Sequence, residues 1–244
     1  MASGDLALVL HAHLPYVRSG EPGSLEQDWY FQALQECYLP LLQVLEEAAA
    51  DPDAEPRLTL GLSPTLLALL SDPGLNQGFL PWLEQRRELL GEAAPSFAEA
   101  AADLDGQLKA TAGQFAACGG NLLPRFRRLQ QAGVLDLISC AATHGYLPLL
   151  RDTPEAVHAQ LATAVRQHQR LLGERPLGIW LPECAYYEGL DRKMAQCGLR
   201  YSLLDGHGLL HALPRPRYGV YAPICSPGGV AVFGRDNEIG RAHV

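Results

Sequence analysis

The sequence predicts an α/β fold in which parallel strands alternate with helices. Three observations indicate this fold class: continuous apolar runs of strand length, amphipathic helical stretches between them, and polar residues that begin where the apolar runs end. The chain has 244 residues and 48% hydrophobic content, which is enough to bury one large core without a second domain.

A long helix separates the first two predicted strands. Leu6–Leu10 is a continuous apolar run, typical of a strand buried on both faces of a parallel sheet. Across 27–50, apolar residues recur at helical spacing and predict an amphipathic helix. Arg57–Gly61 alternates into the second strand, and Ser63 with Pro64 supplies an N-cap and a first helical position. A β-α-β-α series therefore begins here.

Residues 73–132 differ from their surroundings. Alanine is abundant, aromatic residues are sparse, and Gly119 to Asn121 is the strong interruption between helical stretches. We expect a helical insertion, with Trp82 packed inside it.

The strand series then resumes. Val134–Ser139 is the third predicted strand, and a helix is expected at 153–172, where His158 and His168 lie among polar neighbours and should be solvated. The later predicted elements are a strand at Leu177–Leu181, a helix at Leu190–Cys197, a strand at Arg200–Leu204, and short strands at Gly219–Ala222 and Gly229–Phe233 across a Pro-Gly turn.

Polar residues follow four of these strands directly. The C-terminal ends of the strands in a parallel β/α barrel meet on one face, which is where active sites form. His11 and His13 share one face of the first strand by alternation. The candidates at the other strand ends are His144, Glu183, Asp205 and His207.

Glu183 is the strongest catalytic candidate. Its neighbours are mainly apolar or aromatic, including Trp180 and Pro182, so an unused carboxylate would be costly there. The alternative is an ordinary glutamate at a helix start, where the dipole favours negative charge. Because several polar clusters share one rim, we favour a catalytic carboxylate.

The histidines have two functional interpretations. His11 and His13 could be a metal pair, completed by His144, Asp205 and His207, or they could hydrogen-bond sugar hydroxyls. They could also be histidines whose hydrogen bonds are made within the fold and which have no functional role. Sugar rings stack on aromatic planes, and the candidates for such stacking are Trp29, Tyr30, Trp180, Tyr186 and Tyr187.

Charge and cysteine pattern disfavour several classes of protein. A net charge of -8 and an isoelectric point near 5.4 argue against nucleic acid or anionic lipid as partner. The apolar start is too short for a signal peptide or a membrane span, so we expect a cytoplasmic protein. The six cysteines lie far apart without a C-x-x-C pair, so we expect reduced thiols in the core.

Three ordered motifs resemble those of glycoside hydrolase family 57. They are His11–Arg18, the Ala-Thr-His-Gly-Tyr sequence within Leu137–Leu150, and Gly178–Tyr186. The second motif, with Tyr-Leu-Pro-Leu-Leu after the early Trp-Tyr, is most similar to the family's branching enzymes. The resemblance covers residues 5 to about 237.

The resemblance implies an incomplete (β/α)7 barrel with a helical insertion and a retaining mechanism without metal or other cofactor. Glu183 occupies the position of the family's nucleophile. The family's acid/base is an aspartate in a fourth motif beyond this chain, so Asp205 is not given that role. The residues implied to bind α-1,4-glucan are His11, His13, His144, Trp180, Tyr186, Asp205, His207 and Arg235.

The final residues match nothing expected of the family. The segment 238–244 resembles the translation of a sequencing adapter, so we interpret it as a non-native tail. Residues 1–237 would then be a partial barrel, truncated at its C-terminus, inactive and poorly stable because it exposes a sheet edge.

The activity expected is that of a 1,4-α-glucan branching enzyme, which forms α-1,6 branches. The alternatives are a 4-α-glucanotransferase or α-amylase of the same family, a metal-dependent barrel hydrolase or polysaccharide deacetylase, and a non-catalytic glucan-binding protein. The sequence does not indicate the oligomeric state.

Overall fold

The computed structural model describes residues 4–18 and 23–236, so the predicted tail at 238–244 lies outside the described residues. The chain forms two compact units. The first comprises Met1–Pro15, Leu58–Leu67 and Asp136–Val244, and the second comprises Tyr16–Arg57 and Ala68–Leu135.

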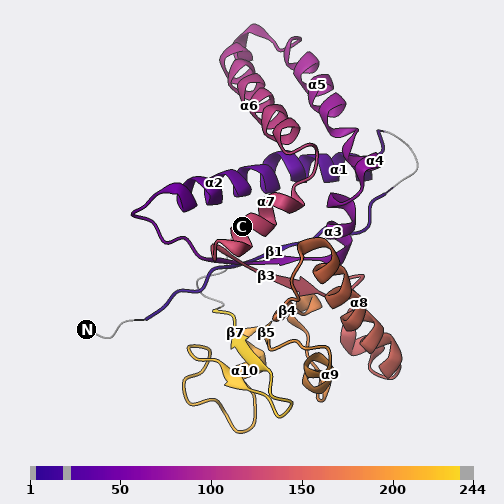
Figure 1. Cartoon of the computed structure of the whole chain (residues 1–244), viewed down its shortest axis with the longest axis vertical. Coiled ribbons are helices and arrows are strands. Elements are labelled where there is room, and N and C mark those ends of the chain that lie inside the picture. The colour runs from indigo at the N-terminus through magenta and orange to yellow at the C-terminus, as the bar shows by residue number, and fades with distance from the viewer. Residues whose placement is uncertain (1–3, 19–22, 237–244) are drawn as a thin grey trace. The chain divides into compact units, whose positions relative to one another are not determined.

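A seven-stranded sheet forms the framework of the first unit, with strand order β1-β2-β3-β4-β5-β7-β6 (Figure 1). Its described pairs are parallel except for the antiparallel β6–β7 hairpin, which confirms the predicted α/β class. The strands are β1 (Val9–Ala12), β2 (Leu58–Leu62), β3 (Leu135–Cys140), β4 (Gly178–Trp180), β5 (Tyr201–Leu204), β6 (Ile224–Cys225) and β7 (Ala231–Gly234).

The first strand lies later in the sequence than expected. β1 begins at Val9, which pairs with Thr59 near the start of β2. Of the residues before it, Leu8 only accepts the Thr59 amide through its carbonyl. Leu6 and Leu8 are accordingly 71% and 57% exposed. As a consequence, His11 belongs to the strand itself instead of following it.

The strand expected at Gly219–Ala222 is wrong. The backbone closes local turns there, since the Gly219 N–H donates to the Pro216 carbonyl and the Tyr221 N–H donates to the Tyr218 carbonyl. These amides are therefore not free to join a sheet. The hairpin partner of β7 is β6, and a Pro-Gly turn joins them as predicted.

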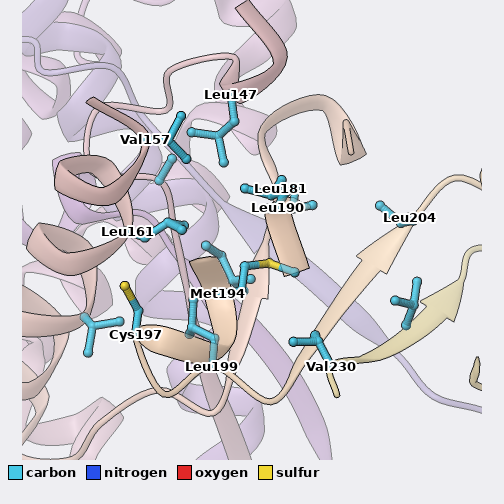
Figure 2. Close-up of a cluster of buried hydrophobic side chains, with 14 of the residues drawn as sticks. Leu147, Val157, Leu161, Leu181, Leu190, Met194, Cys197, Leu199, Leu204 and Val230 are labelled. Carbon is cyan, nitrogen blue, oxygen red and sulfur yellow. The ribbon is translucent and has the colours of Figure 1, made fainter. Parts of the chain in front are cut away.

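Helices α8 (Pro154–Leu172) and α9 (Leu190–Gln196) cover a core that includes side chains from β4, β5 and β7. Figure 2 shows Leu161 of α8, Met194 of α9 and Leu199 pointing toward one another. Burying one such side chain stabilises a fold by about 1.5–3 kcal/mol. This core fixes the C-terminal ends of the central strands. The other helical segments of this unit are α10 (Gly206–Leu210) and short 3-10 turns at Leu147–Leu150 and Pro182–Cys184.

The expectation that His168 is solvated is wrong. Leu161, Val165, His168 and Leu172 recur at helical spacing on the buried face of α8. His168 is fully buried, and neither of its ring nitrogens has a hydrogen-bond partner. His158 is exposed, as predicted.

The second unit is helical, and α5 and α6 pack side by side in it (Figure 1). A π-helical segment, Leu34–Tyr38, interrupts the helix predicted at 27–50. The helices are α1 (Leu25–Ala33), α2 (Leu39–Ala50), α4 (Pro73–Asn76), α5 (Phe79–Leu90), α6 (Ala98–Ala117) and α7 (Leu123–Gln131), while α3 (Pro64–Leu70) has residues in both units.

Trp82 packs within the helical unit, as expected. Its ring lies 5.9 Å from that of Phe79, and its indole N–H donates to Asp28 at 2.6 Å. Phe79 in turn makes an edge contact with Phe115 at 4.7 Å between ring centroids. Trp82 therefore has a packing role.

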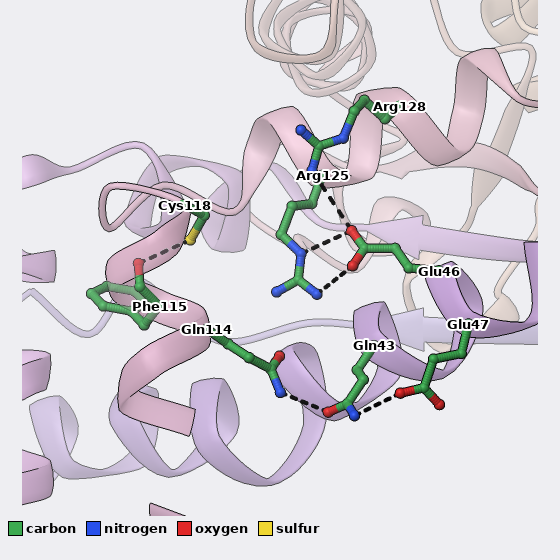
Figure 3. Close-up of polar contacts among 8 residues, drawn as sticks. All are labelled: Gln43, Glu46, Glu47, Gln114, Phe115, Cys118, Arg125 and Arg128. Atoms are coloured by element: carbon green, nitrogen blue, oxygen red, sulfur yellow. Dashed lines mark hydrogen bonds and ion pairs between the residues drawn. The ribbon is translucent and has the colours of Figure 1, made fainter. Parts of the chain in front are cut away.

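An ion pair between the buried Arg125 and the half-buried Glu46 joins α2 to α7 (Figure 3). Arg125 donates to both carboxylate oxygens of Glu46 at 2.9 and 2.7 Å, and Arg128 lies 3.8 Å away. The hydrogen bonds from Arg125 lower the pKa of Glu46. The bidentate geometry explains how an arginine is accommodated inside this unit.

In the described part of the chain, no helix is both long and apolar enough to cross a membrane.

Candidate active site

The site lies at the C-terminal ends of the strands of the first unit, where the sequence predicted it. β1 supplies His11, and the loop after β3 supplies His144. Glu183 follows β4, Asp205 follows β5, and Arg235 follows β7. Contacts between these segments bring together residues that lie far apart in the sequence.

Three imidazoles form the centre of the site. His11 Nε2 lies 3.2 Å from His144 Nε2, and the rings of His13 and His144 stack with centroids 3.9 Å apart. The His11 ring also stacks on Trp180 at 4.9 Å and 7°. Trp180 therefore forms one wall beside the histidines.

Two of these imidazoles, His11 and His13, are neutral near pH 7. Burial and then the neighbouring His144 and His13 lower the pKa of His11 to about 4. Burial and His144 lower the pKa of His13 to about 4 as well. A neutral imidazole offers one donor and one acceptor, so this group suits hydroxyl ligands better than anions.

Ser63 and Thr65 also belong to the site, and the sequence reasoning missed them. His13 Nδ1 lies 3.0 Å from Ser63 Oγ and 3.4 Å from Thr65 Oγ1. The Thr65 hydroxyl donates to the Leu14 carbonyl, while Ser63 Oγ accepts the amide of Leu66 as a helix cap. The available signal was that the second strand, like the others, ends at a polar residue.

Glu183 lies in a strained turn directly after β4. Glu183 and Cys184 have φ of 54° and 51°, and His144 has φ of 54°. Among the described residues these are the non-glycine positions with positive φ. A left-handed conformation costs about 1–2 kcal/mol per residue, and such strain clusters at functional sites. The turn is held by the Cys184 N–H, which donates to the Leu181 carbonyl at 2.8 Å.

The Glu183 side chain is exposed instead of enclosed by its apolar neighbours. Burial raises the pKa of Cys140 to about 12, and the charge of Glu183 adds to that rise. The Cys140 sulfur lies within 4.8 Å of ligand atoms of His11 and His144. The carboxylate is therefore at the same end of the sheet as the imidazoles.

Arg235 joins the other side of the site. Its Nη1 lies 3.2 Å from Asp205 Oδ1 and 3.9 Å from Cys184 Sγ, and its guanidinium is 5.5 Å from the Trp180 ring centroid. His207 is mainly solvent-exposed, with Nδ1 4.0 Å from Asp205. Asp205 therefore positions Arg235, and His207 stands at the rim.

The predicted aromatic residues have different environments. The Tyr186 side chain hydrogen-bonds Asp191, and burial with Asp191 raises the pKa of Tyr186 to about 12. Tyr187 packs against the core of the first unit. Tyr30 is fully buried in the second unit and donates to Asn76, so its predicted role in sugar stacking is wrong. Trp29 is 46% exposed and also belongs to the second unit.

Metal-ligand spacing occurs in a different set from the one proposed from sequence. Within the described residues, His11, Cys140 and His144 have ligand atoms within 4.8 Å of one another. Asp205 contacts Arg235 instead of the histidine trio. The cysteines are free thiols as expected, but Cys37 and Cys225 are exposed and not in a core.

The family follows from a match that covers nearly the whole chain. Residues 7–242 match the model of glycosyl hydrolase family 57. The chain belongs to this family.

Relatives of known name are similar to this family 57 chain. The 1,4-alpha-glucan branching enzyme of Thermococcus kodakarensis is 30% identical over 97% of this chain and 39% of its own length. A probable 1,4-alpha-glucan branching enzyme of Mycobacterium tuberculosis is 32% identical over 97% of this chain and 47% of its own length. The chain thus spans less than half the length of these relatives.

Solved structures of family 57 enzymes share the fold. The alpha-amylase AmyC from Thermotoga maritima superposes with a TM-score of 0.90 at 36% identity, covering 96% of this chain and 46% of that one. The branching enzyme from Pyrococcus horikoshii superposes with a TM-score of 0.89 at 31% identity, and the match covers 97% of this chain and 48% of that one. The sheet topology and these neighbours confirm the predicted incomplete (β/α)7 barrel class.

Proposed function

We propose that this protein is a retaining α-glucan-active enzyme, and specifically a 1,4-α-glucan branching enzyme. The observation that carries the proposal is the strained, exposed Glu183 in the turn after β4, at the same end of the sheet as the three imidazoles. Relatives named as branching enzymes support the specific activity.

In the proposed reaction, Glu183 attacks the anomeric carbon of an α-1,4-linked glucosyl unit. The bond to the departing oxygen breaks, and a covalent glycosyl-enzyme forms. A second carboxyl about 5–5.5 Å away must protonate that oxygen. We assign this role to none of the described residues, consistent with an aspartate of the family's fourth motif.

Branching requires that a glucan 6-hydroxyl reaches the intermediate before water does. Transfer therefore depends on positioning of the acceptor and on exclusion of water. His11, His13 and His144 would hydrogen-bond sugar hydroxyls, because a neutral imidazole, the form that His11 and His13 take near pH 7, has one donor and one acceptor nitrogen. Trp180 would form the apolar wall, and Arg235, held by Asp205, would donate to further hydroxyls.

Replacement of the nucleophile tests the proposal. In the full-length parent enzyme, which supplies the acid/base, Glu183→Gln should lower the branching rate on amylose by at least about a thousandfold, equivalent to about 4 kcal/mol. Glu174→Gln, which changes an exposed glutamate beyond the end of α8, is the matched control and should stay near wild type. Undiminished branching by the Glu183 variant would remove the proposal.

An α-amylase or 4-α-glucanotransferase is the second candidate, because the similar Thermotoga maritima structure is an alpha-amylase. Linkage analysis of the products separates these activities, since only branching creates α-1,6 bonds. A non-catalytic glucan-binding protein would bind amylose without changing its linkages. The family match favours all of these over a deacetylase.

The cytoplasmic location stays a prediction, which cell fractionation can check.

A further inference from the structure

One thiol at the candidate site has no role in the proposed glycosyl transfer. Cys140 is the last residue of β3 and is fully buried, and its sulfur lies within 4.8 Å of ligand nitrogens of His11 and His144. The proposed reaction needs no thiol at this position. A thiol near two imidazoles is a possible set of metal ligands.

The spacing of the two imidazoles suits a shared metal ion. His11 Nε2 and His144 Nε2 are 3.2 Å apart. Two nitrogens bound to tetrahedral zinc at about 2.0–2.1 Å are separated by about 3.3–3.4 Å. The observed distance between the two nitrogens is close to that separation, so a metal could replace the hydrogen bond with little movement of either ring.

The donor set also selects the class of metal. Two imidazoles and one thiolate suit zinc and other borderline or soft ions, whereas magnesium and calcium prefer oxygen ligands. Three protein ligands leave a fourth coordination position open for water. His11 and Cys140 lie on strands, so two of the three ligands are held by the sheet.

We propose that His11, Cys140 and His144 form a binding site for zinc or a similar soft transition-metal ion, and that the bound ion blocks the glucan site. On binding, two metal–nitrogen bonds and one metal–sulfur bond form, and metal-bound waters leave. The thiol proton passes to solvent, and the ring that donates the Nε2–H hydrogen bond carries its proton on Nδ1 instead. The metal blocks the glucan site because the ring nitrogens of His11 and His144 that would hydrogen-bond sugar hydroxyls are then bound to the metal. The proposal thus has a binding half, that the three residues bind the metal, and a blocking half, that the bound metal inhibits the enzyme. The blocking half rests on the proposed function.

Cobalt(II) titration of chelator-stripped protein tests binding independently of activity. The wild type should bind one equivalent and show thiolate-to-cobalt charge-transfer absorption, which zinc should abolish by displacement. Cys140→Ser should lose this absorption and bind zinc at least about tenfold more weakly. Cys197→Ser, at a buried cysteine that forms the C-cap of α9, is the matched control and should behave as wild type.

The binding half is overturned if the wild type shows no charge-transfer band, if Cys140→Ser keeps the band, or if Cys197→Ser loses it. His144→Asn adds a check, because asparagine tolerates the left-handed backbone at this position while removing the imidazole. It should also weaken zinc binding at least about tenfold, with circular dichroism verifying that each variant is folded.

The blocking half is tested by branching assays with zinc or magnesium, each variant compared with its own metal-free rate. Zinc, but not magnesium, should inhibit the wild type, a chelator should restore the rate, and Cys140→Ser should resist zinc. The blocking half is overturned if zinc displaces cobalt from the site and yet leaves the branching rate unchanged. These assays use the full-length parent enzyme, which supplies the acid/base; absence of glucan activity in its metal-free form contradicts the proposed function and leaves the binding result standing.

Discussion

His11 Nε2 lies 3.2 Å from His144 Nε2, although the two residues are 133 positions apart in the sequence. One nitrogen must donate and the other accept, so at least one ring is neutral with a fixed tautomer. The contact links the end of β1 to the loop after β3 and organises the imidazole group. The predictions below concern this group, its supports and the fold around it.

His11 and His13 should stay neutral across the physiological pH range. Because burial holds the pKa of His11 and His13 at about 4, both rings bind protons only as the pH falls toward that value. Ring resonances followed by NMR should therefore shift below about pH 5 and be flat between 6 and 8. Titration of these two rings near their ordinary value of 6.5 would contradict the assigned environment.

Replacement of Gly61 by alanine should impair activity more than stability. Gly61 pairs with His11 across β1 and β2, and a methyl group there would lie 3.0 Å from His11 Nδ1. The ring must shift by a few tenths of an ångström, which disturbs its contact with His144. We expect a loss of about tenfold or more in the branching rate.

Gly106→Ala is the control for that change. Gly106 lies within α6, and nothing stands within 4 Å of an added methyl group. The variant should gain about 0.5–1 kcal/mol in free energy of unfolding and keep full activity. Equal activity losses in the two variants would show that the close approach to His11 is unimportant.

Ser63 should act both as a helix cap and as a support for His13. Ser63→Ala removes the hydrogen bond to His13 Nδ1 and the acceptor for the Leu66 amide, so it should lower the free energy of unfolding by about 1 kcal/mol and also reduce activity. Ser24→Ala removes the cap of α1, in the second unit, and should lower stability alone. NMR of the His13 ring should show a tautomer change only in the Ser63 variant.

His168 should make the fold sensitive to acid. Burial lowers its pKa to about 4, so the neutral ring is favoured in the folded state, and stability is full above the unfolded value of 6.5 and falls as the pH drops toward 4. One pKa unit corresponds to about 1.4 kcal/mol, so this residue alone costs about 2 kcal/mol by pH 5. His168→Leu should flatten the loss seen in urea unfolding between pH 7 and 5. His158→Leu, on the exposed face of α8, should leave that slope unchanged.

The sequence predicts the elements that periodicity controls. Runs such as Leu177–Leu181 and the helix up to Leu172 are found within a few residues, because alternation and helical spacing reflect burial directly. The first strand is misplaced because its limits depend on where β2 offers partners, which local composition does not encode. His168 was misjudged because its immediate neighbours are polar while its helical neighbours are apolar.

The candidate site is predictable to the level of strand ends. Polar residues after apolar runs identify His11, His144 and Glu183, since parallel strands bring those ends together. The left-handed turn at Glu183, the support from Ser63 and the approach of Cys140 to the histidines depend on tertiary packing. Such three-dimensional contacts leave no trace in residue spacing along the chain.

The central claim is that Glu183 forms a covalent bond to the sugar. A fluorinated glucosyl donor that slows breakdown of the glycosyl-enzyme, followed by proteolysis and mass spectrometry, tests it most directly. The account predicts one added glycosyl group on the peptide that contains Glu183, and none in Glu183→Gln. A label on another carboxylate, or α-glucan turnover without any covalent adduct, would contradict it.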